Sequence, residues 1–471
     1  MTLIKSISGI RGTIGGAVGY GLTPIDIVKF SYAYCAKLRE RKQPNGAKYK
    51  VVVGRDARLS GQMVEKLVCG TLIACGVDVV KCGLASTPTC ELAVVFSNAD
   101  GGIIITASHN PRQWNALKLL NEHGEFLTAE QGQSILECAE SGRFDFASAD
   151  ELGKIEEHDF TDEHIDSVLK LKAVDVPAIK AARFKVVLDA INSVGGIIIP
   201  RLLERLGVEC ICLNCEPTGN FAHNPEPLPQ NLIELSGMVV REGADLGISV
   251  DPDVDRLAFI CEDGEPFVEE YTLVSVADYL LGLAVKEGVK DLKTVSNLSS
   301  SRALRDVSEK YGAEYFASAV GEVNVSTMMR EVGAIIGGEG NGGVIYPESH
   351  YGRDAVVGVA LFLSNLAHLG MKVSEYKKTL PQYHIAKSRI ELSDSALIDK
   401  ILSAMKEKFA AEKLNTVDGV RVDFEAKREW VHLRRSNTEP IIRVYSEAQS
   451  AERAEALGRE VIALAESIIA E

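Results

Sequence analysis

Residues 50–83 read KVVVGRDARLSGQMVEKLVCGTLIACGVDVVKCG. A short β-branched run is followed by a polar turn, then by an amphipathic stretch closed by Gly76, and then by a second apolar run. This order predicts a strand, a helix and another strand. The pattern recurs at 185–214 (KVVLDAINSVGGIIIPRLLERLGVECICLN) and at 293–320 (KTVSNLSSSRALRDVSEKYGAEYFASAV). Three βαβ units at intervals of roughly 110–135 residues predict three related α/β domains.

The C-terminal part of the chain, from about residue 375, has a different pattern. Helical stretches at 395–413 and 450–470 flank apolar runs at 417–424, 429–434 and 441–446. We therefore expect three α/β domains with mixed sheets flanked by helices, and then an α+β domain. The expected boundaries are 1–155, 156–258, 259–370 and 371–471.

Composition excludes several classes of function. The chain has 471 residues and a net charge of −15, so it lacks the basic footprint of a non-specific nucleic-acid binder. We find no run of about 18 apolar residues and no secretory leader, so no membrane partner is expected. All ten cysteines precede residue 262, which is not the pattern of a disulfide framework. Reduced thiols and a cytoplasmic location are the expectation.

A serine follows an apolar run in residues 101–111, GGIIITASHNP. The run Ile103–Ile105 predicts a strand, so Ser108 is expected at its carboxyl end, where open α/β sheets bind ligands. With His109 beside it and Lys118 shortly after, Ser108 is a candidate nucleophile or phosphoryl carrier. A polar turn with a capping serine is the competing interpretation.

Three aspartates alternate in residues 247–260, GISVDPDVDRLAFI. In an extended segment, a period of two would point the carboxylates of Asp251, Asp253 and Asp255 the same way. Like charges held together favour a cation, and oxygen-only ligands favour Mg²⁺ or Ca²⁺ over zinc. An EF-hand does not fit, because its glycine position holds Arg256. A solvated acidic turn is the alternative.

Residues 337–343 read GGEGNGG and formally match a dinucleotide fingerprint. The run Val344–Pro347 follows where that motif needs a helix, so the match is false on context. The loop presents Glu339 and Asn341, and a carboxylate with an amide suits paired sugar hydroxyls. A plain tight loop is the competing interpretation. We find no Walker A pattern, which argues against an NTPase.

Residues 434–443, RRSNTEPIIR, crowd arginine, serine, asparagine and threonine side chains into a turn before a strand. Arginine forks, hydroxyls and backbone N–H groups form phosphate cradles. A solvated basic loop is the alternative. Two more basic turns, SGIRG with Arg11 and GRDARLSG with Arg55 and Arg58, add positive charge to the first domain.

Together these segments resemble the α-D-phosphohexomutase superfamily, which includes phosphoglucomutase, phosphomannomutase and phosphoglucosamine mutase. TASHNP is similar to the family's phosphoserine loop, DPDVDR to its metal loop, GEGNGG to its sugar-specificity loop and RRSNTEP to its phosphate-binding loop. The matching features run from SGIRG to RVYSEA, which is essentially the whole chain. The family's fold is three related α/β domains followed by a TBP-like domain, in agreement with the repeats.

The resemblance implies a role for each residue. Ser108 would carry the phosphoryl group, and the Ser108 phosphate would hold one Mg²⁺ together with Asp251, Asp253 and Asp255. His109 and Lys118 would be the candidate acid/base residues, and Arg11 and Arg256 would add charge at the transfer site. The implied substrate contacts are Glu339 and Asn341 for sugar hydroxyls, and Arg434, Ser436, Asn437, Thr438 and Arg443 for the non-reacting phosphate.

The implied reaction interconverts hexose 6-phosphate and hexose 1-phosphate through a phosphoserine. A hexose 1,6-bisphosphate is its intermediate and activator, and a small-molecule sugar phosphate is its partner. We expect a phosphoglucosamine mutase, as a monomer or homodimer. A phosphomannomutase or phosphoglucomutase, and a Mg²⁺-dependent sugar phosphatase, are the alternatives. Intact Ser108 and the three aspartates argue against a non-catalytic sugar-phosphate sensor.

Two residues of the specificity loop depart from the form Glu-x-Ser-Gly-His that bacterial members often have. Asn341 replaces the serine and Gly343 the histidine, which is more like archaeal-type members. Pro252 also stands where the metal loop commonly has glycine. The departures in the specificity loop bear on the choice of sugar and not on the reaction class.

Overall fold

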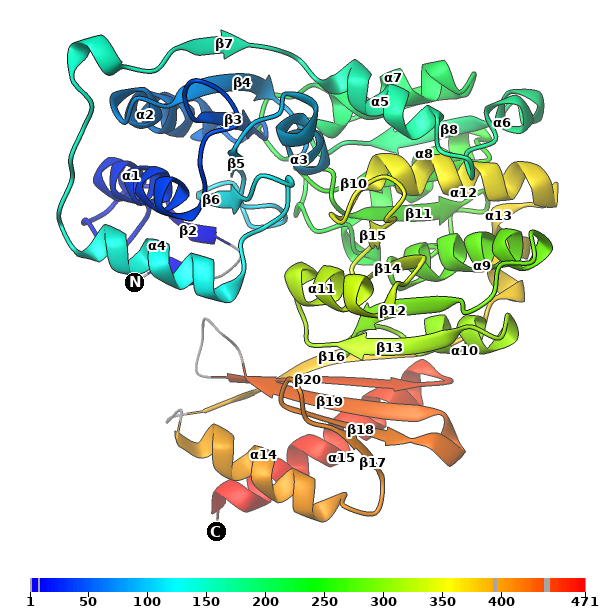
Figure 1. Ribbon diagram of the computed structural model, residues 1–471. Helices are drawn as coiled ribbons and strands as arrows, with labels where there is room; N and C mark the ends of the chain where they lie inside the picture. Colours follow the sequence, from blue (N-terminus) through cyan, green and yellow to red (C-terminus); the bar gives the residue numbers. More distant parts are fainter. Residues whose placement is uncertain (1, 7–8, 393–395, 436–440, 471) are drawn as a thin grey trace. The chain divides into compact units, whose positions relative to one another are not determined.

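The computed structural model describes residues 2–6, 9–392, 396–435 and 441–470 (Figure 1). The chain forms two compact units. The first comprises Met1–Thr272 and Asn341–Tyr376, and the second Leu273–Gly340 and Lys377–Glu471. The helices α9 (Glu270–Lys286) and α13 (Val373–Thr379) span the sequence positions at which one unit ends and the other begins.

The N-terminal sheet of the first unit has seven strands in the order β1-β2-β6-β5-β3-β4-β7. Its strands are β1 (Ile4–Ser6), β2 (Gly9–Thr13), β3 (Lys50–Arg55), β4 (Asp78–Leu84), β5 (Gly101–Ile105), β6 (Trp114–Leu120) and β7 (Ile155–Glu157). The strands β5, β3, β4 and β7 are parallel, and β6, β2 and β1 pair in antiparallel fashion beside them. The sheet is therefore mixed, as expected.

Four helices accompany this sheet: α1 (Pro24–Arg41), α2 (Gly61–Ala74), α3 (Thr87–Phe96) and α4 (Ala129–Glu140). Apolar side chains of α1, α2 and α4 share one buried cluster with the sheet, and those of α3 share another. A capping box of Thr23 and Asp26 starts α1, with Pro24 at its first position. The sheet is thus covered by helices on both faces.

The second sheet of the first unit has the order β11-β10-β8-β9, with β11 antiparallel and the other three strands parallel. Its elements are α5 (Thr161–Leu169), α6 (Val176–Ala182), β8 (Lys185–Asp189), α7 (Gly195–Arg205), β9 (Glu209–Leu213), α8 (Ile233–Glu242), β10 (Leu246–Val250) and β11 (Leu257–Cys261). Later in the chain, β15 (Gly343–Ile345) and α12 (Ala355–Leu369) return to this unit, where α12 packs against α5, α6 and α7.

The second unit begins with parallel strands in the order β13-β12-β14. These elements are β12 (Lys293–Asn297), α10 (Ala303–Lys310), β13 (Glu314–Ser318), α11 (Glu322–Val332) and β14 (Ile336–Glu339). The three predicted βαβ units are therefore confirmed as β3-α2-β4, β8-α7-β9 and β12-α10-β13, each with its two strands parallel and adjacent.

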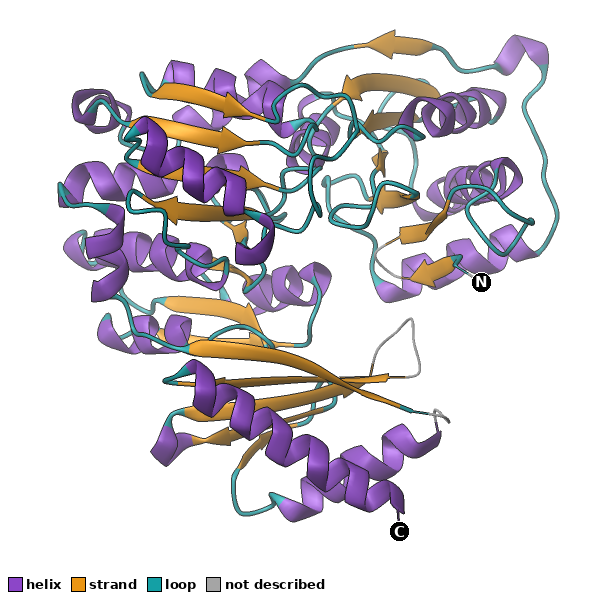
Figure 2. Ribbon diagram, turned by 180° about the vertical axis from the view of Figure 1, so that it is seen from behind, coloured by secondary structure: helices purple, strands orange, loops and turns teal. Residues whose placement is uncertain are grey.

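The C-terminal part of the second unit is an antiparallel sheet in the order β16-β20-β19-β18-β17. Figure 2 shows this sheet with helices along one face. Its elements are β16 (His384–Glu391), α14 (Ala396–Lys408), β17 (Lys413–Asn415), β18 (Val420–Phe424), β19 (Glu429–Arg435), β20 (Ile441–Ala448) and α15 (Ala451–Ala470). One face of the sheet packs on α14 and α15 through a buried apolar cluster. The expectation of an α+β arrangement is confirmed.

Three short 3₁₀ helices complete the described elements: Ala149–Glu151, Pro229–Asn231 and Glu425–Lys427. All ten cysteines are free thiols. Among the described residues, the length and apolar character needed to cross a membrane are found in no single helix, although the bent pair α12 and α13 together meets that criterion.

Candidate active site

Ser108 lies in the loop that joins β5 to β6, in the first unit. Its backbone φ is +48°, a left-handed conformation that is uncommon for a residue other than glycine. The backbone N–H of Ser108 donates to Thr106 Oγ1 at 2.9 Å, and the residue is only 4% exposed. The side chain therefore leaves the end of the strand in a fixed direction, as expected for a reactive group at this edge of the sheet.

Arg58, whose side chain is fully buried, holds the loop around Ser108 through hydrogen bonds. Arg58 Nε donates to Asp56 Oδ2 at 2.9 Å, and Asp56 Oδ2 also accepts from Thr106 Oγ1 at 2.7 Å. The terminal nitrogens of Arg58 donate to the backbone carbonyls of four loop residues, Ser108, Asn110, Pro111 and Trp114. The sequence identified Arg58 only as positive charge, whereas its contacts make it the brace of the serine loop.

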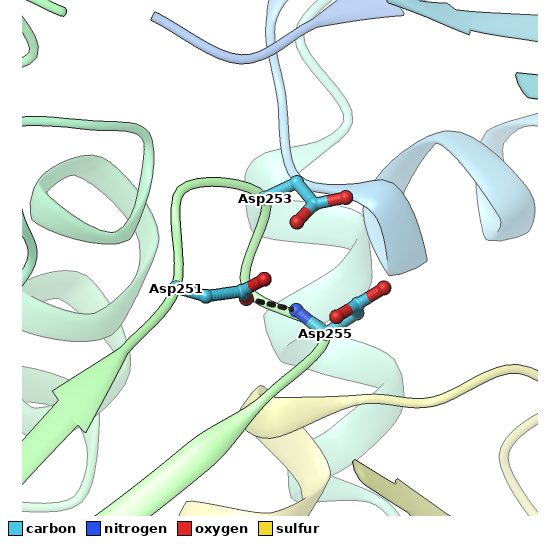
Figure 3. Close-up of side chains that lie close together, drawn as sticks. All are labelled: Asp251, Asp253 and Asp255. Atoms are coloured by element: carbon cyan, nitrogen blue, oxygen red, sulfur yellow. Dashed lines mark hydrogen bonds between the residues drawn. The ribbon is translucent and has the colours of Figure 1, made fainter. Parts of the chain in front are cut away.

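The three aspartates lie in the turn between β10 and β11 (Figure 3). Asp251, Asp253 and Asp255 are each 0% exposed, and each offers a carboxylate oxygen within 4.8 Å of the others. The sequence suggested that alternation in an extended segment would align the carboxylates. That reason was wrong, because the segment is not extended. Val254 adopts a φ of +62°, and it is this turn that brings the carboxylates together.

Each carboxylate has one oxygen engaged by fixed donors. Asp251 Oδ1 accepts from the backbone N–H groups of Asp255 and Arg256 at 3.1 Å each. Asp253 Oδ2 accepts from Lys118 Nζ and Thr87 Oγ1 at 2.7 Å each.

For Asp255, the close donor is Arg353 Nη2, at 2.7 Å from Oδ2, and Lys118 Nζ lies 3.4 Å from the same oxygen. The second oxygen of Asp251, Oδ2, accepts from Ser108 Oγ at 2.7 Å. Asp253 Oδ1 and Asp255 Oδ1 are buried and accept no hydrogen bond from the described residues.

Crowding shifts the acid–base behaviour of this cluster. Burial, together with the charges of Asp253 and Asp255, raises the pKa of Asp251 well above its usual range. Burial opposes ionisation of Asp253 too, but Lys118 and the hydrogen bonds of this carboxylate lower its pKa. Burial would lower the pKa of Lys118, yet Asp253 and Asp255 raise it above its ordinary value, so Lys118 stays cationic.

Four cationic side chains and one neutral imidazole surround the serine and the aspartates. Lys118 lies on β6 and Arg11 on the adjacent β2, where Arg11 Nη1 donates to Asn110 Oδ1 at 2.9 Å. Arg256 follows the aspartates, with its Nη1 3.2 Å from Glu226 Oε1 and its Nε 4.0 Å from Asp255 Oδ1. The fourth cation is Arg353.

His109 Nδ1 lies 3.4 Å from Ser108 Oγ. Burial, and then the positive charges of Arg256 and Arg11, lower the pKa of His109 well below its usual range. The ring is therefore neutral near pH 7.

The donor set fits a hard divalent cation. All three side chains offer oxygen, and two of the buried carboxylate oxygens have no hydrogen-bond donor among the described residues. Buried carboxylate oxygens without partners are costly unless a cation or donor satisfies them. Mg²⁺ and Ca²⁺ both accept such ligands, and zinc prefers nitrogen and sulfur.

The specificity loop is divided between the two units. In the first unit, Asn341 Oδ1 accepts from Gly343 N–H at 3.2 Å, and Gly342 O accepts from Leu257 N–H at 3.0 Å, next to the metal loop. In the second unit, Glu339 ends β14 and is 4% exposed.

Glu339 Oε1 is held by two donors, Asn297 Nδ2 at 2.7 Å and Gly321 N–H at 3.1 Å. β15 follows the loop, so no helix stands where a dinucleotide fingerprint would need one.

The second unit also carries Arg434 on β19 and Arg443 on β20, which are direct cross-strand partners. Arg443 is in turn the partner of Arg389 on β16, so three arginines form a row across one face of the sheet. This face is opposite the one that packs on α14 and α15, because alternate residues such as Leu433 and Val444 belong to the buried cluster.

In this row, Arg434 Nε lies 3.3 Å from Asp418 Oδ2. By contrast, the neighbouring Arg435 pairs with Asp399 on α14, at 3.1 Å. Ser436, Asn437 and Thr438 lie outside the described residues.

The structure thus places Ser108, His109, Lys118, Arg11, Arg256 and the three aspartates together in the first unit, and Glu339, Arg434 and Arg443 in the second. Sequence reasoning missed Thr87 and Arg353, which both bind the aspartates. A threonine in STPT and an arginine in YGRDA carry no local signal of such a contact.

Comparison with known proteins gives one consistent result. Models described as phosphoglucomutase/phosphomannomutase, alpha/beta/alpha domains I, II and III, match residues 3–146, 162–264 and 269–383. The C-terminal domain of the same family matches residues 388–464.

A phosphoglucomutase/phosphomannomutase from Thermococcus kodakarensis is 36% identical over 450 residues, which is 94% of this chain and 95% of the relative. A probable phosphoglucosamine mutase from Pyrococcus abyssi is 33% identical over 412 residues, or 87% of this chain and 88% of the relative. The solved structure of a phosphoglucomutase/phosphomannomutase family protein from Burkholderia thailandensis is 26% identical, with a TM-score of 0.82 over 99% of this chain and 98% of its own.

Proposed function

Because the chain belongs to the phosphoglucomutase/phosphomannomutase family and is a hexose-phosphate mutase, we propose that it interconverts glucosamine 6-phosphate and glucosamine 1-phosphate, with Ser108 as the phosphoryl carrier. The observation that carries the assignment of Ser108 is its 2.7 Å hydrogen bond to Asp251, in a buried cluster of carboxylates and cations. A serine that only capped a turn would not be expected to donate a hydrogen bond to an aspartate of a buried carboxylate cluster.

The charge around Ser108 supports a site for phosphate and metal together. When all three carboxylates are ionised, as cation binding would require, they carry three negative charges, and the side chains of Lys118, Arg256 and Arg353 lie within 4.0 Å of them. A phosphoserine adds about −2 and a divalent cation adds +2, so the total stays near balance when both are bound. Either one alone would leave the buried cluster strongly charged, which is unfavourable in a low-dielectric site.

The residues that would hold one Mg²⁺ are Asp251, Asp253 and Asp255 with the Ser108 phosphate, and the bound ion would neutralise charge on the phosphoryl group during transfer. Phospho-Ser108 would give its phosphoryl group to the free hydroxyl at C1 or C6, which produces a hexose 1,6-bisphosphate. After the bisphosphate turns round, its other phosphate would return to Ser108 Oγ.

The surrounding side chains have separate tasks in this proposal. His109, whose Nδ1 lies 3.4 Å from Ser108 Oγ, would accept the proton of the attacking sugar hydroxyl, which is the role of a general base. Lys118, held cationic, would stabilise negative charge rather than take a proton. Arg11 and Arg256 would attract the phosphate in the transfer site.

The remaining candidate residues would bind the rest of the sugar phosphate. Glu339 and Asn341 would contact hydroxyls, or the amino group that distinguishes glucosamine. Arg434 and Arg443, with Ser436, Asn437 and Thr438, would bind the phosphate that is not reacting. Two arginines on adjacent strands, partly compensated by Asp418 beside Arg434, leave positive charge that supports a phosphate at this position.

Among the mutases, phosphomannomutase or phosphoglucomutase activity is the second candidate. It is favoured by the 36% identity to the Thermococcus kodakarensis phosphoglucomutase/phosphomannomutase, against 33% for the Pyrococcus abyssi protein. Since the family consists of mutases, the sugar-phosphatase alternative has no comparable support.

The test compares kcat/KM for glucosamine, mannose and glucose 6-phosphates under one set of conditions, with a catalytic amount of the matching bisphosphate. We expect the highest kcat/KM with glucosamine phosphate. A higher value with mannose or glucose phosphate would overturn the choice of sugar, and release of inorganic phosphate in place of an isomer would favour the phosphatase alternative.

Three further expectations remain proposals: the domain boundaries at 155/156, 258/259 and 370/371, a monomer or homodimer, and a cytoplasmic location. Light scattering on the purified protein tests the oligomeric state. Limited proteolysis tests the boundaries, since linkers are cleaved before folded domains.

A further inference from the structure

Arg353 reaches the metal loop from the segment that precedes α12. Its Nη2 donates to Asp255 Oδ2 at 2.7 Å, and its side chain is 8% exposed. Backbone contacts fix this segment to the metal loop, because Ala355 N–H donates to Val254 O at 3.2 Å. The next residue, Asp354, caps α12 by accepting from Val356 N–H at 2.8 Å. The position of the Arg353 backbone is therefore well determined.

Gly343 provides the space that the Arg353 side chain needs. A Cβ atom at Gly343 would lie 2.3 Å from Arg353 Cδ, closer than any real contact. Gly343 is the position at which the sequence departs from the histidine of the bacterial form. Glycine at position 343 thus has a structural consequence in this chain, because it leaves room for the Arg353 side chain to reach the aspartate cluster.

Each of the three aspartates has one carboxylate oxygen engaged by fixed donors, and its other oxygen accepts from Ser108 Oγ, in Asp251, or from no described donor, in Asp253 and Asp255. Backbone amides engage Asp251 Oδ1, and Lys118 and Thr87 engage Asp253 Oδ2. For Asp255, Arg353 is the close donor, since Lys118 is at 3.4 Å. Without Arg353, the carboxylate of Asp255 could rotate and offer both oxygens to a cation.

We propose that Arg353 is a positioning residue that keeps Asp255 a one-oxygen ligand and thereby makes the site prefer Mg²⁺ to Ca²⁺. The inference rests on the proposed function, in which the aspartates hold a divalent cation. Mg²⁺ is small and requires near-octahedral ligands, so it is suited by single oxygens from several side chains. Ca²⁺ is larger and accepts six to eight oxygens, often with both oxygens of one carboxylate.

The first experiment measures Mg²⁺ and Ca²⁺ binding by titration calorimetry on full-length protein phosphorylated at Ser108, as confirmed by intact-mass spectrometry, because the Ser108 phosphate is one of the proposed ligands. The variants are Arg353→Met, which removes the donors and keeps an unbranched stem, and Arg353→Lys, which keeps the charge and loses the fork. Arg205→Gln is the control, because Arg205 forms an exposed ion pair with Asp166 on the surface of the same unit.

For Arg353→Met, we expect the affinity for Ca²⁺ relative to Mg²⁺ to rise about tenfold, the size of effect typical of residues that orient a metal ligand. Because Arg353→Met removes a positive charge near the ion, we expect this variant to bind neither Mg²⁺ nor Ca²⁺ more weakly than the wild type. Arg353→Lys should lie between Arg353→Met and the wild type, and Arg205→Gln should match the wild type. A purely structural role would instead lower the melting temperature and weaken both ions alike.

The second experiment is steady-state kinetics with saturating Mg²⁺. Because a rotated Asp255 would bind the ion in the wrong place, Arg353→Met should lower kcat about tenfold or more while KM for the sugar phosphate changes little. Gly343→Ala should move the metal preference in the same direction, since the added methyl group displaces Arg353 Cδ.

An unchanged ratio of Ca²⁺ to Mg²⁺ affinity in Arg353→Met, with wild-type protein that binds Mg²⁺ normally, would overturn the role of Arg353. Failure of the wild type to bind either ion would instead overturn the proposed metal site itself. The two failures are therefore distinguishable in one set of titrations.

Discussion

Ser108 Oγ donates a 2.7 Å hydrogen bond to Asp251 Oδ2, although the two residues are 143 positions apart. The contact joins the loop after β5 to the turn after β10, both at carboxyl ends of strands in the first unit. Two α/β sheets thus present their functional edges to each other, which is where open sheets place their ligands. The first prediction concerns this serine.

Ser108→Ala should lower mutase turnover by about three orders of magnitude or more, because the variant lacks the proposed carrier of the phosphoryl group between half-reactions. Activity is measured with the hexose 1,6-bisphosphate present, and intact-mass spectrometry follows phosphorylation. The wild type should contain a phosphorylated fraction that maps to Ser108 and is absent from the variant. Near-normal turnover of Ser108→Ala would contradict the assignment.

Asp253→Asn should weaken Mg²⁺ binding and reduce turnover by about 100-fold, since hard cations require carboxylate charge. The measurements are metal titration and the Mg²⁺ dependence of kcat. Asp263→Asn, in an exposed turn after β11, is the matched control and should behave as the wild type. Wild-type activity that persists after thorough chelation would remove the metal from the mechanism.

Arg58→Lys should loosen the serine loop, because a lysine cannot reproduce the donors that Arg58 gives to Asp56 and to four backbone carbonyls. We expect faster amide hydrogen exchange in residues 106–114 and a decrease in kcat of at most about tenfold. Arg55→Lys is the control, as Arg55 gives one hydrogen bond, to Asp56 O. Unchanged exchange in the loop would show that Arg58 does not brace it.

Arg434→Ala should raise KM by about 10- to 100-fold, the loss expected for one charge-assisted contact. The non-reacting phosphate is bound in both ground and transition states, so kcat should change less than KM. A weaker hold should also release more hexose bisphosphate during turnover.

The control for this prediction is Arg435→Ala, because Arg435 pairs with Asp399 on the other side of the sheet. Bisphosphate is quantified in the same reactions. If KM, kcat and bisphosphate release were all unchanged in Arg434→Ala, the arginine would have no part in substrate binding.

His350 predicts a pH dependence of stability. Its side chain is 12% exposed and lies between Glu91 and Asp354, with its ring nitrogens 3.2 Å from a carboxylate oxygen of each. Burial would lower the pKa of His350, but the two carboxylates raise it to about 10. The Gly352 N–H also lies 3.1 Å from Nδ1, yet a ring between two carboxylates is better described as the imidazolium. His164 Nε2 also lies 2.9 Å from Asp354 Oδ2, the oxygen that faces His350 Nε2.

The pKa of His350 is thus higher in the folded protein than the value of about 6.5 in the unfolded chain. Its contribution to stability is complete below about pH 6.5 and is lost as the pH rises to about 10. Between pH 7 and pH 10 the free energy of unfolding of the wild type should fall more than that of His350→Gln, as measured by denaturant titration. His123→Gln, at an exposed turn, should follow the wild type. Parallel curves for the wild type and His350→Gln would contradict the ion cluster.

Much of this fold was predictable because the signals are local. The units at 50–83, 185–214 and 293–320 each contain a complete strand, helix and strand, so the repeats could be found without distant contacts. The three aspartates were also found, although for the wrong reason. No pattern reveals that Val254 takes a left-handed conformation, and this turn gathers the carboxylates.

Residues that act through distant contacts could not be found in the same way. Arg353 meets Asp255 from 98 positions away, and Thr87 meets Asp253 from 166 positions away. Their roles depend on the packing of α3 and α12 beside the metal loop, and also on the absence of a side chain at Gly343. Such roles are properties of the assembled fold, and their residue types carry no trace of them.

From the row of Arg389, Arg443 and Arg434, we expect the thermal stability of the C-terminal sheet to depend on the anion in the buffer. Three guanidinium groups lie on neighbouring strands, with Asp418 and Glu391 as counter-charges of Arg434 and Arg389, and an anion beside Arg443 would add a favourable contact only in the folded state. Folding and anion binding are therefore linked equilibria in this sheet. In phosphate or sulfate the sheet should melt at a higher temperature than in chloride at equal ionic strength. The buffer anion would then act as a ligand of the folded sheet.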